Sequence, residues 1–508
     1  METRQGGGEP EREGVNLGPT GPKMSRPRTP AAARQRPGDA AASSRTSSGA
    51  AERADAAYDE VFRPDGRPRP GYRELLRQLE AREPRELGRR LKRRLGERGV
   101  TFGAADDGIF ALDPVPRVLT SAEWEPLAAG ITQRARALES LARDAYGERD
   151  AVAAGVLPAR VLQGAPHLEP AMVGAAVRRW IGVAGFDLVR GPDGRFRVLE
   201  DQVRMPSGLG YAVAAREELA ALLPPPADLR PVSQAFGLLG AALRDAAPDG
   251  VADPSVVVLA EGPGAAAWYE HERLGRALGA PVVTLDDLEH RRGRIAARRE
   301  RQLLPVDVVY QRTEEDRFSD ERGRLTALGE ALLEPCRAGR LACVNAPGSG
   351  VCDDKVVHAY VPELIRFYLG EEPLLDSVRS YDLAAERARE EALRRLDGLV
   401  IKPRGEMGGA DVVIWSDADE RQRRRTLERL RSEPERVIAQ ERVLLSTHPT
   451  LWQGRLEPRH VDLRPYALVT NDGPDVLPGG LTRVALEPGS LIVNSGQGGG
   501  VKDTWVLA

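Results

Sequence analysis

The chain has 508 residues, which is enough for two to four domains and a large hydrophobic core. Charged residues make up 29% and nearly balance, to a net charge of −3, so the basic footprint of a nucleic-acid-binding protein is missing. No apolar run approaches the ~18–20 residues of a membrane span, and the first thirty residues lack the apolar stretch of a secretion signal. We therefore expect a soluble, cytoplasmic protein with no nucleic-acid or membrane partner, and the composition leaves its oligomeric state open.

The cysteines and histidines do not form a recognisable metal or disulfide pattern. Cys336, Cys343 and Cys352 match neither a zinc spacing nor a disulfide framework. The six histidines occur without an HxxxH or similar grouping. The sequence therefore predicts reduced structural thiols and no dedicated zinc site.

The N-terminal segment is not expected to fold. Residues 1–55 are rich in Gly, Pro, Ala, Ser and Arg and contain few large apolar side chains, which predicts a disordered tail. Residues 56–225 are expected to hold a helical region followed by a β-hairpin. In the helical region, Leu87, Leu91 and Leu95 recur every four residues, and this spacing predicts one buried stripe of a helix.

Two strand-like runs joined by a Gly-Pro-Asp-Gly turn predict the hairpin at residues 186–202. Pairing across a four-residue loop puts Asp187 opposite Val198, with Glu200 as its diagonal neighbour on the same face. Gln202 continues that face. Two carboxylates and an amide oxygen are hard ligands, which suit Mg²⁺ carrying nucleotide phosphates. A solvated hairpin with ordinary surface charges is the alternative, because acidic residues beside such turns are common.

The pattern changes from residue 255 to strand, turn, helix and strand, which is typical of a parallel sheet. We therefore expect a Rossmann-like subdomain at residues 226–345. Its turn contains Gly262 and Gly264 but no third glycine at the spacing of a dinucleotide fingerprint. A plain turn between strand and helix is the preferred interpretation over NAD or FAD binding.

A lysine stands at an unusual place in the next segment, residues 341–376. This segment starts on a strand, passes a Gly-rich turn and enters a helix that Asp353 or Asp354 can cap. Lys355 lies in the first turn of that helix, where the helix dipole disfavours a cation. An anionic ligand would explain the lysine, and a salt bridge to either aspartate would explain it equally well.

A second lysine precedes a glycine loop. Residues 396–415 predict an apolar strand that delivers Lys402, a loop containing Gly408 and Gly409, and a second strand. Backbone N–H groups of such a loop can cradle phosphates while the lysine neutralises them. An ordinary hairpin is the alternative, because the GK[ST] of a Walker A loop is missing.

The C-terminal third contains further candidate residues. A strand is predicted to run into a short connector at Gln440 and Glu441, and a later strand carries Arg464. The chain ends in a glycine-rich stretch between strand-like segments, near Arg483 and Asn494. This setting favours a loop that faces phosphate or substrate over a loose tail.

The most specific phrases of the sequence are LEDQVRMPSGLGY, VNAPGSGVCDDKVVHAYVPELIRFYLGEEPLL, and LPGGLTRVAL with VNSGQGGGVKDTWVL. Together they resemble the circularly permuted ATP-grasp proteins related to glutathionylspermidine-synthase-like ligases. The resemblance covers Tyr58 to the C-terminus. It implies an α/β (α+β) fold: a circularly permuted ATP-grasp with a Rossmann-like pre-ATP-grasp subdomain, a helical N-terminal region beside the metal-binding hairpin, and nucleotide-binding subdomains at residues 346–508. Motif order supports the permutation, because the hairpin here precedes both lysines, whereas in unpermuted enzymes it comes last.

The resemblance also implies an activity. An ATP-grasp ligase uses ATP and Mg²⁺ to join a carboxylate to an amine through an acyl phosphate, and releases ADP and phosphate. The substrates would be a small molecule or peptide with a carboxylate, and an amine acceptor. The implied roles are Mg²⁺ ligands at Asp187, Glu200 and Gln202, phosphate lysines at Lys355 and Lys402, flap glycines at Gly408 and Gly409, an adenine-reading hinge at Gln440 and Glu441, and phosphate-facing Arg464, Arg483 and Asn494.

One departure from the family pattern keeps other functions open. Gln202 stands where these proteins usually have Asn, and it lengthens a metal ligand by one methylene. A nucleotide-binding scaffold without chemistry is therefore a second hypothesis. A kinase-like enzyme that stops at a phosphorylated product is a third.

Overall fold

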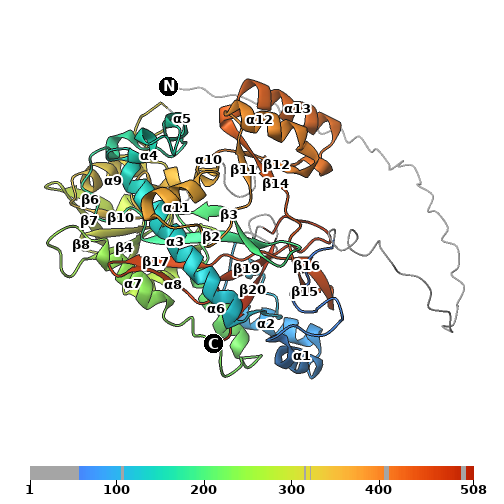
Figure 1. The fold of residues 1–508 in the computed structure, drawn as a ribbon. Helices are drawn as coiled ribbons and strands as arrows, with labels where there is room; N and C mark the ends of the chain where they lie inside the picture. Colours follow the sequence, from blue (N-terminus) through green and yellow to red (C-terminus); the bar gives the residue numbers. More distant parts are fainter. Residues whose placement is uncertain (1–55, 104–107, 314–315, 321, 406–410, 494–498) are drawn as a thin grey trace, which may run out of the picture. The chain divides into compact units, whose positions relative to one another are not determined.

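The computed structural model describes residues 56–103, 108–313, 316–320, 322–405, 411–493 and 499–508. The predicted tail at 1–55, Gly408, Gly409 and Asn494 lie outside the described residues. The mixed α/β class expected from the sequence is confirmed by the helices and sheets of the chain (Figure 1). The described helices include none with the length and apolarity needed to cross a membrane.

The helical N-terminal region forms as expected. The leucine stripe lies on α2, where Leu87, Leu91 and Leu95 are all buried. The long helix of this region starts at a capping box, in which Thr120 and Glu123 satisfy each other's backbone N–H groups. The helices are α1 (Tyr72–Glu80), α2 (Pro84–Glu97), α3 (Ser121–Ala145), α4 (Asp150–Ala153) and α5 (Ala159–Gln163).

Strands from two distant parts of the described chain form the central sheet. Its order is β18-β17-β2-β3, from β2 (Val183–Arg190), β3 (Phe196–Gln202), β17 (Tyr466–Thr470) and β18 (Gly473–Val476). The β17 strand pairs antiparallel with β2, although some 280 positions separate them in sequence. In Figure 1, α3 crosses in front of this sheet. The hairpin expected at residues 186–202 is therefore confirmed as β2 and β3, at one edge of the sheet.

An early strand and two late strands form a second sheet of order β1-β20-β19. It contains β1 (Arg117–Leu119), β19 (Leu481–Val484) and β20 (Gly500–Val506). The β1 strand runs parallel to β20. Two further helices, α6 (Leu209–Ala220) and α7 (Ala235–Asp245), follow the hairpin, and α6 packs on β20. The pairing of β2 with β17 and of β1 with β20 agrees with the permuted order of the motifs.

The Rossmann-like pattern is confirmed by a four-stranded sheet in which every pair of neighbours is parallel. Its order is β10-β9-β4-β5, from β4 (Val256–Leu259), β5 (Val282–Val283), β9 (Val308–Gln311) and β10 (Ala342–Val344). The helices are α8 (Trp268–Leu278) and α9 (Ala327–Arg337), and a small antiparallel sheet is inserted from β6 (Leu288–Arg291), β7 (Arg294–Arg299) and β8 (Gln302–Val306). One hydrophobic core joins this sheet to α3 and the hairpin.

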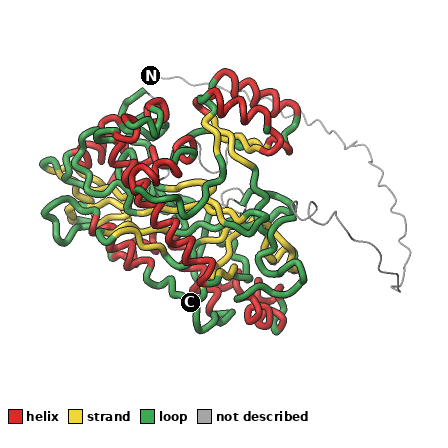
Figure 2. Tube along the Cα trace, viewed as in Figure 1, coloured by secondary structure: helices red, strands yellow, loops and turns green. Residues whose placement is uncertain are grey.

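The last region contains an antiparallel sheet of order β11-β14-β12-β13. The helices α12 (Glu386–Arg394) and α13 (Glu420–Ser432) lie together beside its strands (Figure 1), in the same place as in Figure 2. A separate small hydrophobic core packs the sheet against these helices, and it includes the buried side chains of Leu399 and Ala439. The elements are α10 (Lys355–His358), α11 (Val361–Leu369), β11 (Ser380–Asp382), α12 (Glu386–Arg394), β12 (Leu399–Pro403), β13 (Val413–Ile414), α13 (Glu420–Ser432), β14 (Val437–Glu441), β15 (Thr447–Trp452) and β16 (Arg455–His460).

Two details of the sequence prediction are wrong. The expected connector at Gln440 and Glu441 is instead the end of strand β14, and both residues pair with neighbouring strands of the sheet. The hairpin register is also different: Arg190 pairs with Phe196, and Asp187 pairs directly with Glu200. The domain boundaries at 225 and 345 stay predictions.

Candidate functional site

A pocket is lined by residues of the hairpin and of the β11-β14-β12-β13 sheet. We call it the two-lysine pocket. Five of the residues predicted from sequence line it, although they come from four separate elements: Glu200 and Gln202 of β3, Lys355 of α10, Lys402 of β12 and Gln440 of β14. The structure therefore brings both expected phosphate lysines and two of the three expected metal ligands to one place.

A β-bulge orients the hairpin toward this pocket. The register shifts by one residue between the pairs of Leu188 with Val198 and of Asp187 with Glu200. Leu199 is the extra residue in β3, and such a bulge reverses which side chains face each side of the strand. Glu200 consequently shares a face with Asp187, as expected, but as its direct cross-strand partner instead of its diagonal neighbour.

Lys402 and Glu200 form the central ion pair of the pocket. The Lys402 Nζ lies 3.0 Å from Glu200 Oε1, and the lysine side chain is 8% exposed. Although burial alone would raise the pKa of Glu200, the charges of Lys402 and Lys355 hold that pKa well below its usual value. Gln202 lies beside this pair, with its amide nitrogen 3.3 Å from Glu200 Oε2. The carboxylate is thus kept ionised and available to a cation.

Asp187 lies in a separate, buried ion-pair cluster. Its carboxylate accepts two hydrogen bonds from Arg464, at 2.6 and 2.8 Å, and lies 2.9 Å from the Arg483 guanidinium. Arg483 also pairs with Asp462, at 3.0 Å through its Nε. Burial raises the pKa of Asp187, but the two arginines outweigh it and keep the pKa below its ordinary value. The expected roles of Asp187, Arg464 and Arg483 toward metal and phosphate stay predictions.

The two residues predicted to form the adenine-reading hinge face opposite ways. Gln440 donates its amide N–H to the carbonyl of the bulge residue Leu199, at 3.1 Å, and to Ser380 Oγ, at 3.0 Å. Its amide oxygen is buried and has no hydrogen-bond partner among the described residues. The Glu441 side chain instead lies 3.1 Å from Arg395. Of the two side chains, only Gln440 lines the pocket.

Sequence reasoning missed His358, which also lines the two-lysine pocket. Its Nδ1 lies 2.9 Å from Asp201 Oδ2, and Asp201 is held by two hydrogen bonds from Arg134. The His358 Nε2 is buried and has no hydrogen-bond partner among the described residues. Burial lowers the pKa of His358, which favours the neutral ring. No spacing marked this residue in advance, because a lone histidine in a helical turn has no distinctive pattern.

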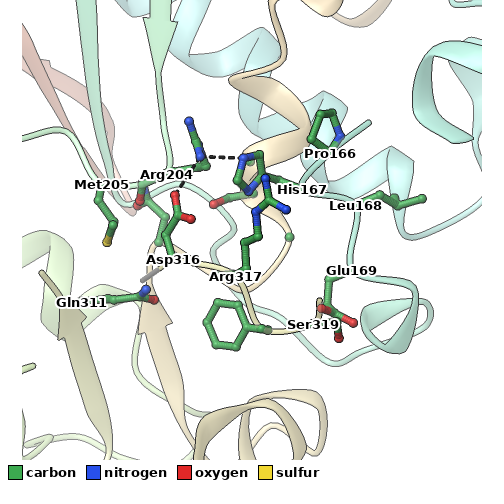
Figure 3. A pocket seen from close by; sticks show the side chains of 16 residues that line it. Pro166, His167, Leu168, Glu169, Arg204, Met205, Gln311, Asp316, Arg317 and Ser319 are labelled. Atoms are coloured by element: carbon green, nitrogen blue, oxygen red, sulfur yellow. Dashed lines mark hydrogen bonds and ion pairs between the residues drawn. The ribbon is translucent and has the colours of Figure 1, made fainter. Parts of the chain in front are cut away.

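A second pocket has a residue in common with the first (Figure 3). We call it the Glu169 pocket. It shares Arg204 with the two-lysine pocket. Its other lining residues come from the segment after α5, the loop after β9 and the turn after β10. None of its residues belongs to the set predicted from sequence.

The expected metal set has only two carboxylates. Among the described residues, no group of three or more His, Cys, Asp or Glu side chains is arranged to hold a metal ion. Cys336 and Cys343 face each other at 3.2 Å between sulfur atoms, and all three cysteines are buried thiols, as expected. Burial raises the pKa of Cys336 and Cys352, so these thiols are poor metal ligands.

Comparison with known proteins gives consistent matches. A provisionally named glutamate–cysteine ligase 2-3 of Frankia alni is 44% identical over 89% of this chain, which spans 54% of that protein. An uncharacterized protein of Synechocystis sp. is 40% identical over 89% of this chain and 97% of its own length. The chain thus spans about half the length of the ligase-named relatives. A glutathione synthetase-like effector of Globodera pallida, solved in its apo form, has a TM-score of 0.54 at 11% identity, covering 88% of this chain and 100% of that one.

The family model for circularly permuted ATP-grasp type 2 proteins matches residues 116–485. This span includes the hairpin, both pocket lysines and Gln440, so it covers the site as well as the scaffold. The fold expected from the motifs is confirmed. Since the family model spans more than half of the chain and relatives match it at 40% identity or more, the chain belongs to the circularly permuted ATP-grasp type 2 family.

Proposed function

We propose that the protein is an ATP-dependent carboxylate–amine ligase that works through an acyl phosphate. The observation that carries the proposal is the joint lining of one pocket by Lys355, Lys402 and Glu200. Two lysines can neutralise nucleotide phosphates, and phosphoryl transfer depends chiefly on such positioning and charge neutralisation.

The proposed reaction has two steps. An oxygen of the substrate carboxylate bonds to the γ-phosphorus of ATP, and ADP leaves. The nitrogen of the neutral amine then bonds to the acyl carbon, phosphate departs with the electrons of the C–O bond, and the nitrogen loses one proton to solvent to give the amide. The pocket lysines stabilise the charge that develops on phosphate oxygens in both steps.

The residues of the two-lysine pocket fit a nucleotide with magnesium. Glu200 and Gln202 would hold the ion through hard oxygen ligands, with Asp187 opposite Glu200 on the hairpin. When bound, the ion would neutralise phosphate charge. Gln440 and His358 each have a buried polar atom without a partner among the described residues, and a base or ribose offers groups that could satisfy them.

The substrate class follows only in outline from the relatives. Two of them, from Frankia alni and Frankia casuarinae, carry names of the glutamate–cysteine ligase type. A ligase of that name joins amino acids, which agrees with a small molecule or peptide that has a carboxylate and an amine acceptor.

Calorimetric titration of ATP with Mg²⁺ tests the proposal. Lys402→Ala should weaken ATP binding about ten- to 150-fold, since a charge-assisted contact to phosphate contributes about 1.5–3 kcal/mol. The matched control is Lys92→Ala, which removes a lysine from the exposed side of α2. Equal ATP affinity of Lys402→Ala and wild type, with both folded by circular dichroism, would contradict the proposed nucleotide site.

ADP release from mixtures of amino acids, short peptides and polyamines distinguishes the three functions. Release that requires both an acid and an amine supports the ligase. Release with the acid alone would identify a kinase-like enzyme, and ATP binding without release would identify a scaffold.

A further inference from the structure

Glu169 is a buried carboxylate that the rest of the described chain leaves without a partner. The residue is 5% exposed and lines the Glu169 pocket (Figure 3). Its backbone N–H donates to the Tyr146 hydroxyl at 3.0 Å, but among the described residues no hydrogen bond or ion pair reaches its carboxylate. The Glu169 carboxylate is therefore free to bind a group that enters the pocket.

The pocket occupies a position where parallel sheets commonly bind ligands. Gln311 is the last residue of β9, and Asn345 directly follows β10, so both stand at the carboxyl ends of neighbouring parallel strands. Ligands of open α/β sheets bind in the crevice outside those ends. The backbone turn on this side is tight: a Cβ added to Gly350 would lie 2.5 Å from His167 Cβ and 2.7 Å from Arg204 Cδ.

Arg204 forms the wall between this pocket and the two-lysine pocket. Its Nε donates to Asp353 at 2.7 Å, and its Nη1 lies 2.7 Å from Asp316 and 2.6 Å from His167 Nε2. Asp353 is two positions before the pocket lysine Lys355. A ligand in the Glu169 pocket would therefore lie one side chain away from the nucleotide phosphates.

We propose that the Glu169 pocket binds the amine substrate, as a primary ammonium group held by the Glu169 carboxylate. The inference rests on the proposed ligase function, because the amine needs a place beside the activated acid. An ammonium group supplies both the positive charge and the hydrogen-bond donors that this carboxylate lacks. The shared Arg204 wall would then align the amine with the phosphorylated carboxylate.

Calorimetry on the full chain tests the site with defined probes: putrescine and glycinamide as primary amines, and sodium acetate as an anionic control. Wild type should bind both amines and not acetate, and Glu169→Gln should bind them at least tenfold more weakly. The matched control, Glu330→Gln, removes the same charge from an exposed position of α9 and should bind like wild type. Without amine, Glu169→Gln should melt at the same temperature as wild type, because no described residue pairs with the charge that it removes.

Several results would overturn the proposal. These are equal amine binding by wild type and Glu169→Gln, no binding of either amine by wild type, binding of acetate instead, or a lower melting temperature of Glu169→Gln, which would indicate a structural role. Failure of the ligase function gives a different pattern: amines would bind while ATP does not. Loss of amine binding in a protein that still binds ATP would count against the Glu169 site alone.

Discussion

At the scale of residues, the two carboxylates of the hairpin have separate cationic partners. Glu200 pairs with Lys402, whereas Asp187, its cross-strand partner, pairs with Arg464 and Arg483. Each hairpin carboxylate thus has its own cationic partner, which avoids the repulsion of two adjacent carboxylates. A metal ion between them would have to compete with these pairs, so substitution of the hairpin residues is the direct test of the metal site.

Glu200→Ala should abolish the Mg²⁺ dependence of ATP binding, because it removes the charged ligand of the pocket. Gln202→Asn keeps the amide oxygen and restores the family's usual residue, so Mg²⁺ affinity should be unchanged or higher. Titration of Mg²⁺ with ATP into both variants measures this, with Glu390→Ala on the exposed side of α12 as the control. If Glu200→Ala binds Mg²⁺ and ATP as wild type does, the hairpin is not the metal site.

At the scale of elements, the 3-10 helix η3 (Ser349–Cys352) lines the Glu169 pocket through Ser349 and Gly350. Gly350 is the point of closest approach, where any side chain would meet His167 and Arg204. Gly350→Ala should lower the free energy of unfolding by about 1–3 kcal/mol, as overpacking does. It should also weaken ligand binding, because Arg204 must move. Gly398→Ala is the control, since nothing lies within 4 Å of its added Cβ.

Thermal and urea denaturation of the two glycine variants give the measurement. Gly398→Ala should match wild type or exceed it slightly, because alanine reduces the entropy of the unfolded chain. Equal stability of Gly350→Ala and wild type would show that η3 has room to shift.

The hairpin shows what sequence could and could not predict about an element. The Gly-Pro-Asp-Gly turn and the apolar runs correctly placed both strands, because turn chemistry and alternation are local signals. The bulge at Leu199 could not be predicted from nearby residues. Its carbonyl accepts a hydrogen bond from Gln440, which lies 241 positions later in the sequence. The ion pairs of Asp187 could not be predicted for the same reason, because Arg464 and Arg483 lie far along the chain.

At the scale of the whole molecule, the order of motifs was the most informative feature. A hairpin that precedes its lysines implied a permuted fold, and the pairing of β2 with β17 and of β1 with β20 agrees with it. The Glu169 pocket was not predictable in this way. It is assembled from segments that carry no motif, and its defining residue stands out only through its burial and missing partner.

Stability of the whole chain should fall as the pH drops below about 6.5. His271 and His448 are buried, and burial lowers the pKa of His271 to about 3 and that of His448 well below its usual value. Both therefore remain neutral in the folded protein, while the unfolded chain binds their protons near pH 6.5. Because the unfolded state then holds more protons, the stability present above pH 6.5 is lost on acidification, by up to about 1.4 kcal/mol per pH unit for each histidine.

Urea denaturation between pH 7.5 and 5 measures the slope of unfolding free energy against pH. His448→Gln should reduce it by about one proton, whereas His290→Gln, at an exposed site, should leave it unchanged. An identical slope in His448→Gln and wild type would show that this histidine is not the source of the acid sensitivity.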